Sequence, residues 1–77
     1  MTMKDVEYYM NLPWKIELKK IPFIEGGGFY ASIPSLGELV YTARGETEQE
    51  AIKELQRITR MLFEKNLREG IPIEEPK

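Results

Sequence analysis

Three glutamates at alternate positions, Glu46, Glu48 and Glu50, form the cluster in this 77-residue chain that comes closest to a chemical site. Carboxylates can hold a metal ion or transfer a proton, but both roles require further converging groups. The sequence contains no histidine and no cysteine, so the commonest general base and the usual zinc ligands are missing. Acidic residues are also favoured at the start of a helix by its dipole. We therefore interpret the glutamates as a helix start, and we expect no catalytic residue, no metal and no cofactor.

A run of three glycines at 26–28, which includes Gly27 and Gly28, is the second feature that could bind a ligand. Glycine-rich loops cradle phosphate, but the phosphate-binding motif also needs a lysine followed by serine or threonine at the start of a helix. Here the glycines are followed by Phe29 and an alternating apolar and polar segment, which is typical of a strand. We interpret the run as the loop of a β-hairpin.

The helix that positions the glutamates is predicted at about residues 48–69. Thr47 and Glu50 have the spacing of a capping box, in which the threonine hydroxyl accepts from the Glu50 N–H and the glutamate accepts from the Thr47 N–H. Gly70 is a typical C-terminal cap, and Pro72 prevents the helix from continuing. Apolar residues recur at steps of three and four and predict one buried face: Ala51, Ile52, Leu55, Ile58, Leu62, Phe63 and Leu67.

Three short strands are predicted before this helix, at residues 14–21, 29–33 and 39–44, because apolar and polar residues alternate there. Turns are expected at Pro34, Gly37 and Gly45. Short connections predict an antiparallel meander that needs an apolar layer on one face. The apolar positions of the three strands are Trp14, Ile16, Leu18, Phe29, Ala31, Ile33, Leu39, Tyr41 and Ala43.

The predicted fold is therefore α+β: a single domain over residues 1–77 with a three-stranded antiparallel meander and one long helix packed across it. A short helix is predicted at residues 5–12, before Pro13. Ile71 and Ile73 leave room for a very short fourth strand, which Pro72 would confine to an edge of the sheet.

Charge and length limit the classes of function. Eleven Lys and Arg against thirteen Asp and Glu give a net charge of −2, which does not favour general attraction to nucleic acid or to an anionic membrane. No apolar run approaches the roughly 20 residues of a membrane-spanning helix, and no signal peptide is recognisable. We expect a cytoplasmic protein with no membrane partner. A chain of this size buries limited surface, so we also expect a homodimer or higher oligomer.

A family resemblance extends over nearly the whole sequence. In order and spacing, the chain resembles the HicB antitoxin family, in the form that consists of the antitoxin domain alone. Many relatives have a Leu-Pro-Gly turn followed by a small residue, whereas this chain has Leu36-Gly37-Glu38-Leu39. The segments that carry the resemblance are Glu7-Tyr8-Tyr9, Leu12-Pro13-Trp14, residues 27–34, Leu36-Gly37, Gly45-Glu46-Thr47, Glu50-Ala51, Leu55 and residues 69–76.

The resemblance implies a partial ribonuclease H-like fold, with a meander, a helix across it and a short last strand. It also implies a partner: HicA, a small basic toxin that cleaves messenger RNA and depends on a histidine of its own. In this interpretation the chain covers the active surface of the toxin and catalyses nothing. Full-length antitoxins carry a C-terminal helix-turn-helix or ribbon-helix-helix segment. Because this sequence stops at Lys77, direct binding to operator DNA is not expected.

The residues predicted to meet the toxin are Glu46, Glu48 and Glu50, which would complement a basic surface, with Tyr30 and Tyr41 as interface aromatics. The alternative for the two tyrosines is that they complete the core or a dimer contact. The second hypothesis for function is an RNA-binding or orphan regulatory module that has lost its toxin. The order of elements also matches the double-stranded RNA-binding domain, but an acidic helix start would repel phosphate. An enzyme is the weakest hypothesis.

Overall fold

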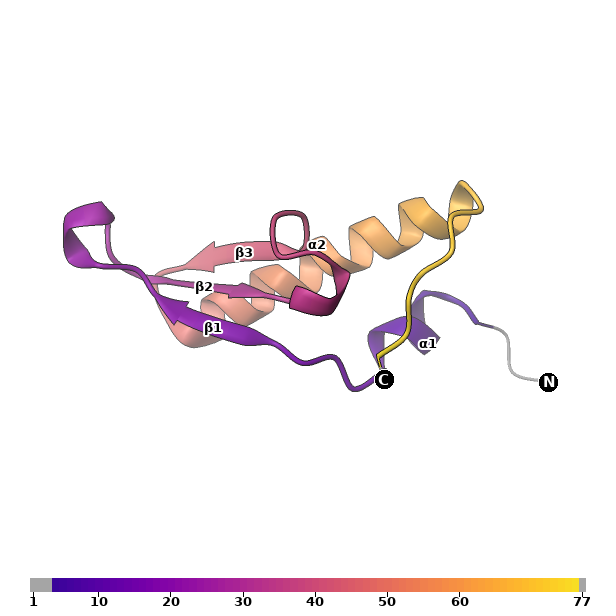
Figure 1. Ribbon diagram of the computed structural model, residues 1–77, viewed down its shortest axis with the longest axis horizontal. Helices are drawn as coiled ribbons and strands as arrows, with labels where there is room; N and C mark the ends of the chain where they lie inside the picture. The colour runs from indigo at the N-terminus through magenta and orange to yellow at the C-terminus, as the bar shows by residue number, and fades with distance from the viewer. Residues whose placement is uncertain (1–3, 77) are drawn as a thin grey trace.

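A three-stranded antiparallel sheet and one long helix form the two layers of the computed structural model, which describes residues 4–76 (Figure 1). The strands lie in the order β1-β2-β3, so β2 is central and both other strands are edges. This arrangement confirms the predicted α+β fold, the meander and the short N-terminal helix. The α-helices and strands are α1 (Val6–Met10), β1 (Glu17–Lys20), β2 (Phe29–Ser32), β3 (Thr42–Gly45) and α2 (Glu48–Arg68). Two short 3-10 helices, η1 (Phe23–Glu25) and η2 (Pro34–Leu36), follow β1 and β2.

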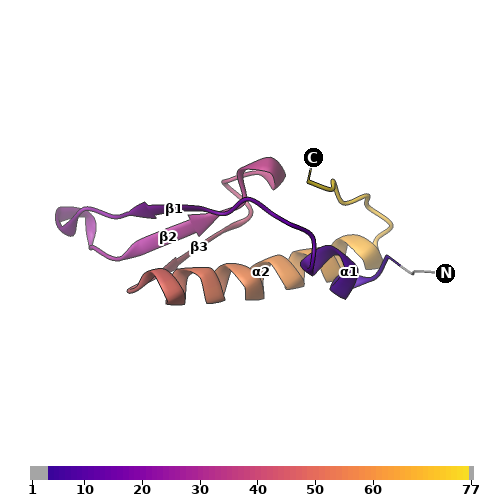
Figure 2. The same ribbon diagram turned by 90° about the horizontal axis from the view of Figure 1, so that it is seen from below.

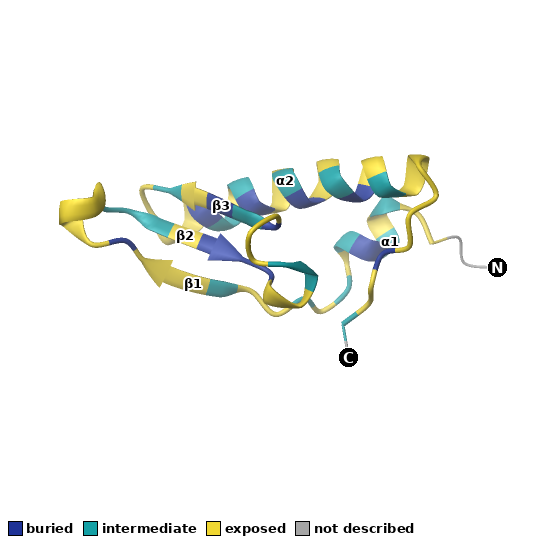
Figure 3. Cartoon of the chain, turned by 45° about the horizontal axis from the view of Figure 1, so that its top comes forward, coloured by how far each residue is buried: buried dark blue, intermediate teal, exposed yellow. Residues whose placement is uncertain are grey.

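The core lies between α2 and the strands β2 and β3 (Figures 2 and 3). Ala31 and Ala43 are cross-strand partners, and both belong to the buried cluster that also contains Ala51 and Leu55 of α2. Small side chains at these positions let the helix approach the sheet closely. Farther along α2, the buried ring of Phe63 packs against three other aromatic rings, with centroids 5.7–6.0 Å away: Tyr9, Trp14 and Tyr41.

The third strand is shorter than predicted. Residues 39–41 belong to a turn, in which the N–H groups of Val40 and Tyr41 both donate to the carbonyl of Gly37 at 3.1 and 2.8 Å. Gly37 has φ +112°, a conformation that favours glycine, so the chain closes tightly there before β3 begins. Leu39 is consequently 92% exposed and does not belong to the core. Tyr41 and Ala43 are buried as predicted.

The first strand is also shorter than predicted and its apolar side is poorly covered. Leu18 shares a face with Ala31 and Ala43, yet 37% of its surface is exposed, because α2 packs mainly on β2 and β3. On the helix itself, Leu67 lies outside the buried face. Thr59, which the apolar pattern missed, is 2% exposed and lies inside it.

The predicted fourth strand is absent from residues 71–76. The N–H of Ile71 donates to the Asn66 carbonyl at 2.8 Å, which closes the end of α2, and Pro72 has no N–H for a strand ladder. The tail turns toward α1, where the Glu75 carboxylate accepts from Lys4 Nζ and from the Tyr8 hydroxyl, both at 2.9 Å. These two hydrogen bonds lower the pKa of Glu75.

Residues 4–76 contain two α-helices, α1 and α2. Neither α2 nor the short α1 combines the length and the apolar composition that crossing a membrane requires.

Candidate partner-binding site

The glutamates lie where β3 turns into α2, at a capped helix start. The Thr47 hydroxyl accepts from the Glu50 N–H at 3.1 Å, as predicted. The Glu50 carboxylate, however, accepts from the N–H of Glu46 at 3.0 Å and not from that of Thr47, which corrects the prediction by one residue. The cap therefore occupies the carboxylate of Glu50, while the side chains of Glu46 and Glu48 are exposed on either side of Thr47.

Two glycines allow three segments to meet at this point. A Cβ at Gly45 would lie 2.4 Å from the backbone nitrogen of Ala51, so the end of β3 contacts the first turn of α2 directly. Gly28 has φ +87°, and a Cβ there would lie 2.7 Å from the Gly45 carbonyl oxygen. The glycine loop, the end of β3 and the helix start together surround a hollow of about 680 Å³, lined by Gly26, Gly27, Gly28, Arg44, Gly45, Glu46 and Glu50.

Arg44 is the residue of this region that the sequence interpretation missed. Its Nη2 donates to the carbonyls of Glu25 and Gly27 at 3.3 and 3.4 Å, and thereby braces the glycine loop against β3. A Cβ at Gly26 would lie 2.7 Å from the same nitrogen, so the backbone of the loop lies directly against the guanidinium group. The order of the residues does not reveal this contact, because it depends on the hairpin register that places Arg44 beside Tyr30.

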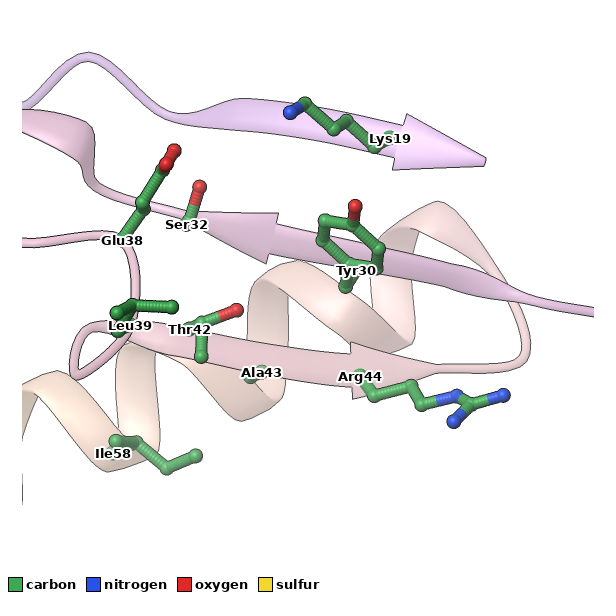
Figure 4. Close-up of a pocket in the computed structure, with 9 residues that line it drawn as sticks. All are labelled: Lys19, Tyr30, Ser32, Glu38, Leu39, Thr42, Ala43, Arg44 and Ile58. Atoms are coloured by element: carbon green, nitrogen blue, oxygen red, sulfur yellow. The ribbon is translucent and has the colours of Figure 1, made fainter. Parts of the chain in front are cut away.

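Tyr30 lies on the open face of the sheet, on the side away from α2. The register pairs it with Lys19 on β1 and with Arg44 on β3, so an aromatic ring lies between two cations (Figure 4). Its ring borders a groove of about 620 Å³ that also reaches Leu39 and Ile58. Through Arg44, this groove adjoins the hollow at the helix start.

Tyr41 is placed differently. It is 7% exposed and packs in the core, where its hydroxyl accepts from Asn66 Nδ2 at 3.3 Å. Burial raises the pKa of Tyr41, and the hydrogen bond from Asn66 partly opposes this rise. This position agrees with the alternative in which the tyrosine completes the core, and it leaves little of the side chain for a partner.

The three glutamates take part in none of the ion pairs formed within residues 4–76. Those pairs join Lys4 to Glu75, Lys19 to Glu17, Arg57 to Glu54 and Arg60 to Glu7. Over the same part of the chain, no three carboxylates are grouped so that they could hold a metal ion. The arrangement presents exposed negative charge on a rigid turn, which suits electrostatic contact with a basic surface.

Comparison with models of protein families, with curated proteins and with solved structures gave no match to this chain.

Proposed function

We propose that this chain is a HicB-like antitoxin, a cytoplasmic binding protein that neutralises a basic, messenger RNA-cleaving toxin of the HicA type by covering its active surface. The proposal rests on the resemblance of the sequence to that family. One observation of the structure carries it further: Glu46 and Glu48 are exposed and unpaired among the described residues, on a turn held by Gly45 and the helix cap. A basic toxin would meet these carboxylates without first breaking an internal ion pair.

The neighbourhood of the carboxylates supports a protein partner. The backbone of the turn is held by the helix cap, so little backbone freedom is lost on binding, and the negative charges speed the encounter with an oppositely charged surface. Tyr30, which lies beyond Arg44 on the open sheet face, supplies an aromatic contact of the kind that often dominates interface energies. Binding alone would account for neutralisation, so the proposed antitoxin needs no chemistry of its own.

A second function, RNA binding, is favoured by a specific feature of the open face. Tyr30 lies between Lys19 and Arg44 on adjacent strands, and aromatic rings flanked by cations are used to stack the bases of single-stranded nucleic acid. Against this, the platform has a single aromatic ring, and Glu46 lies close to Arg44. We therefore rank RNA binding below toxin binding.

The test is rescue of growth. The small basic protein encoded beside this chain would be expressed as the toxin, with and without the chain, and complex formation would be measured with a variant of the toxin that lacks its histidine. We expect the chain to restore growth and to bind the toxin. The double change Glu46→Lys and Glu48→Lys should weaken binding by at least about tenfold, because two favourable contacts become repulsive.

The matched control is Glu64→Lys with Glu69→Lys, which alters net charge equally on exposed parts of the chain far from the turn. If both double variants weaken binding to the same extent, general charge and not this turn is responsible. Tight, steeply salt-dependent binding to single-stranded RNA that is lost on Tyr30→Ala would contradict the antitoxin proposal and support the second function.

A further inference from the structure

The edge strand β1 is more exposed than β3, the other edge strand of the sheet. Its residues from Leu18 to Lys20 are exposed, because α2 packs mainly on β2 and β3. Beyond its end, the β1–β2 loop projects from the molecule (Figure 1). This loop contains two large apolar residues, Phe23 at 95% and Ile24 at 93% exposure. Exposed edges and exposed apolar clusters both mark surfaces that pair with another chain.

The direction of the free backbone groups on β1 follows from its pairing with β2. The Ile21 N–H donates to the Gly28 carbonyl at 2.8 Å, so Ile21 and, by the alternation of an antiparallel ladder, Lys19 and Glu17 bond toward β2. The N–H and carbonyl groups of Leu18 and Lys20 therefore point away from the sheet, where an additional strand would bond to them.

A second copy of β1 fits this edge in one register. In two-fold antiparallel pairing, the free groups allow any residue of the strand, from Glu17 to Lys20, to lie opposite its own copy, and pairing on Lys20 opposes two ammonium groups. Pairing on Glu17 opposes two carboxylates, and pairing on Lys19 opposes two ammonium groups. Pairing on Leu18 instead places Glu17 opposite Lys19 on both sides of the axis, and opposite charges across strands are favourable.

The same register uses the apolar surface that α2 leaves uncovered. The two Leu18 side chains would meet on the helix side of the joined sheet, where each is now partly exposed. Because the two copies run antiparallel, the loop with Phe23 and Ile24 would lie on the side of the partner from which residues 12–14 lead into its β1. That segment, with Ile16, borders an apolar groove of about 220 Å³.

The other edge of the sheet is less suited to a second copy. β3 leaves the tight turn at Gly37 and passes directly into the cap of α2, so the turn and the helix start lie at its two ends. The side chain of Arg44 is already bonded to the glycine loop. The chain around β1, in contrast, exposes apolar side chains on both sides of the strand, Ile16 before it and Phe23 and Ile24 after it.

We propose that this chain forms a two-fold homodimer by antiparallel pairing of β1 with β1 of a second copy, with Leu18 on the axis and Glu17 facing Lys19 across it. The six strands then form one continuous sheet. This inference specifies the oligomer expected of the proposed antitoxin, but its test uses the chain alone, so it can fail or succeed independently of any toxin.

Charge reversal with mixing tests the register. Glu17→Lys and Lys19→Glu would each place like charges opposite one another in a homodimer, and each should weaken dimerisation by about tenfold, as measured by sedimentation equilibrium. An equimolar mixture of the two variants restores opposite charges across the axis and should dimerise more tightly than either variant alone. The ion pair within one copy, with Lys19 Nζ 3.2 Å from Glu17 Oε1, is lost in both variants, so it cannot explain recovery on mixing.

The β1–β2 loop gives a second test that leaves the fold intact. Phe23→Ser with Ile24→Ser should weaken dimerisation by at least about tenfold, since two large side chains lose their covered position. The melting temperature of the dilute monomer should stay unchanged, because both side chains are more than nine-tenths exposed in one copy. A chain that remains monomeric at all concentrations would overturn the proposal, as would dimerisation that is insensitive to both charge reversals.

Discussion

The two edges of the sheet differ in what covers them, although both consist of four residues. β3 has α2 packed against it, and it connects a closed turn directly to a capped helix, so its apolar side chains are buried. β1 lies outside the main contact of α2, with Leu18 partly exposed and the exposed apolar side chains of Phe23 and Ile24 in the loop beyond it. The same meander therefore has a closed edge that holds the fold together and an open edge that remains available to another chain.

The difference originates in where the helix lies and not in the strands themselves. Leu18 and Ala43 face the same side of one sheet, yet only the second is buried. Because the stability of a small domain depends on the apolar surface it buries, changes at the β3 side should affect folding. Changes at the β1 side should affect association instead.

The largest expected effect is a difference in unfolding free energy between two leucine-to-alanine variants, one in the core beneath β2 and β3 and one on β1. Leu55→Ala removes a side chain that is 1% exposed beneath β2 and β3, and it should cost about 2–5 kcal/mol of unfolding free energy. The matched change Leu18→Ala on β1 should cost less than about 1 kcal/mol in the dilute monomer, because its site is partly open. Urea denaturation measures both, and equal costs would remove the distinction between the edges.

Gly45→Ala should destabilise the junction of β3 with α2 by about 1–3 kcal/mol, because its Cβ would overlap the backbone of the first helical turn. Thermal unfolding of this variant measures the cost. Gly27→Ala is the control, since a Cβ there meets nothing within 4 Å and only its φ of +71° opposes the change. If Gly45→Ala were tolerated as well as the control, the contact between β3 and the helix start would be looser than described.

Thr59→Val should stabilise the chain by about 1–2 kcal/mol. The Thr59 hydroxyl is buried on the β1 side of α2, beside the apolar groove, and it has no hydrogen-bond partner within residues 4–76. Replacing an unsatisfied polar group by a methyl group of similar size removes its desolvation cost. Thr59→Ser, which keeps the hydroxyl, should not stabilise. Loss of stability in the valine variant would indicate that the hydroxyl has a partner.

Thr47→Ala should cost about 1 kcal/mol, because the Glu50 N–H loses its cap. Thr47→Ser keeps the oxygen and should be close to the parent chain. Denaturant unfolding of the two variants compares them directly. The cap lies next to β3 and not next to β1, so dimerisation should be unaffected. A change in dimer affinity would show that the helix cap also influences association through β1.

The smallest expected effect is a loss of stability at low pH through Glu75, which lies in the tail after α2 and not at either edge of the sheet. Hydrogen bonds from Lys4 and Tyr8 lower the pKa of Glu75 in the folded chain, so this carboxylate adds stability above its unfolded pKa. That contribution is lost as the pH falls through the folded pKa. Glu75→Gln should therefore flatten the acid side of the stability profile, measured by melting temperature against pH, with Glu74→Gln as the matched control. An unchanged profile would contradict the contact between the tail and α1.

Local signals predicted much of this fold. The capping residues Thr47 and Glu50, the spacing of apolar residues after them and the alternation before them were enough for the long helix and the antiparallel meander. The failures are tertiary: Leu39 has the pattern of a strand but sits in a turn closed by Gly37, and Ile73 sits in a tail drawn toward α1. At the site, exposed glutamates were predictable from the cap. The role of Arg44 and the burial of Tyr41 depend on register and packing, which no short stretch of sequence encodes.

Amide hydrogen exchange at the two edges, followed against protein concentration, tests the difference between them most directly. The N–H groups of Leu18 and Lys20 on β1, and of Thr42 and Arg44 on β3, are the free donors of the sheet by the alternation of its ladders. We expect exchange at Leu18 and Lys20 to slow as concentration rises, while Thr42 and Arg44 exchange at a constant rate. Slowing at Thr42 and Arg44, or no dependence on concentration at Leu18 and Lys20, would contradict the assignment of β1 as the open edge.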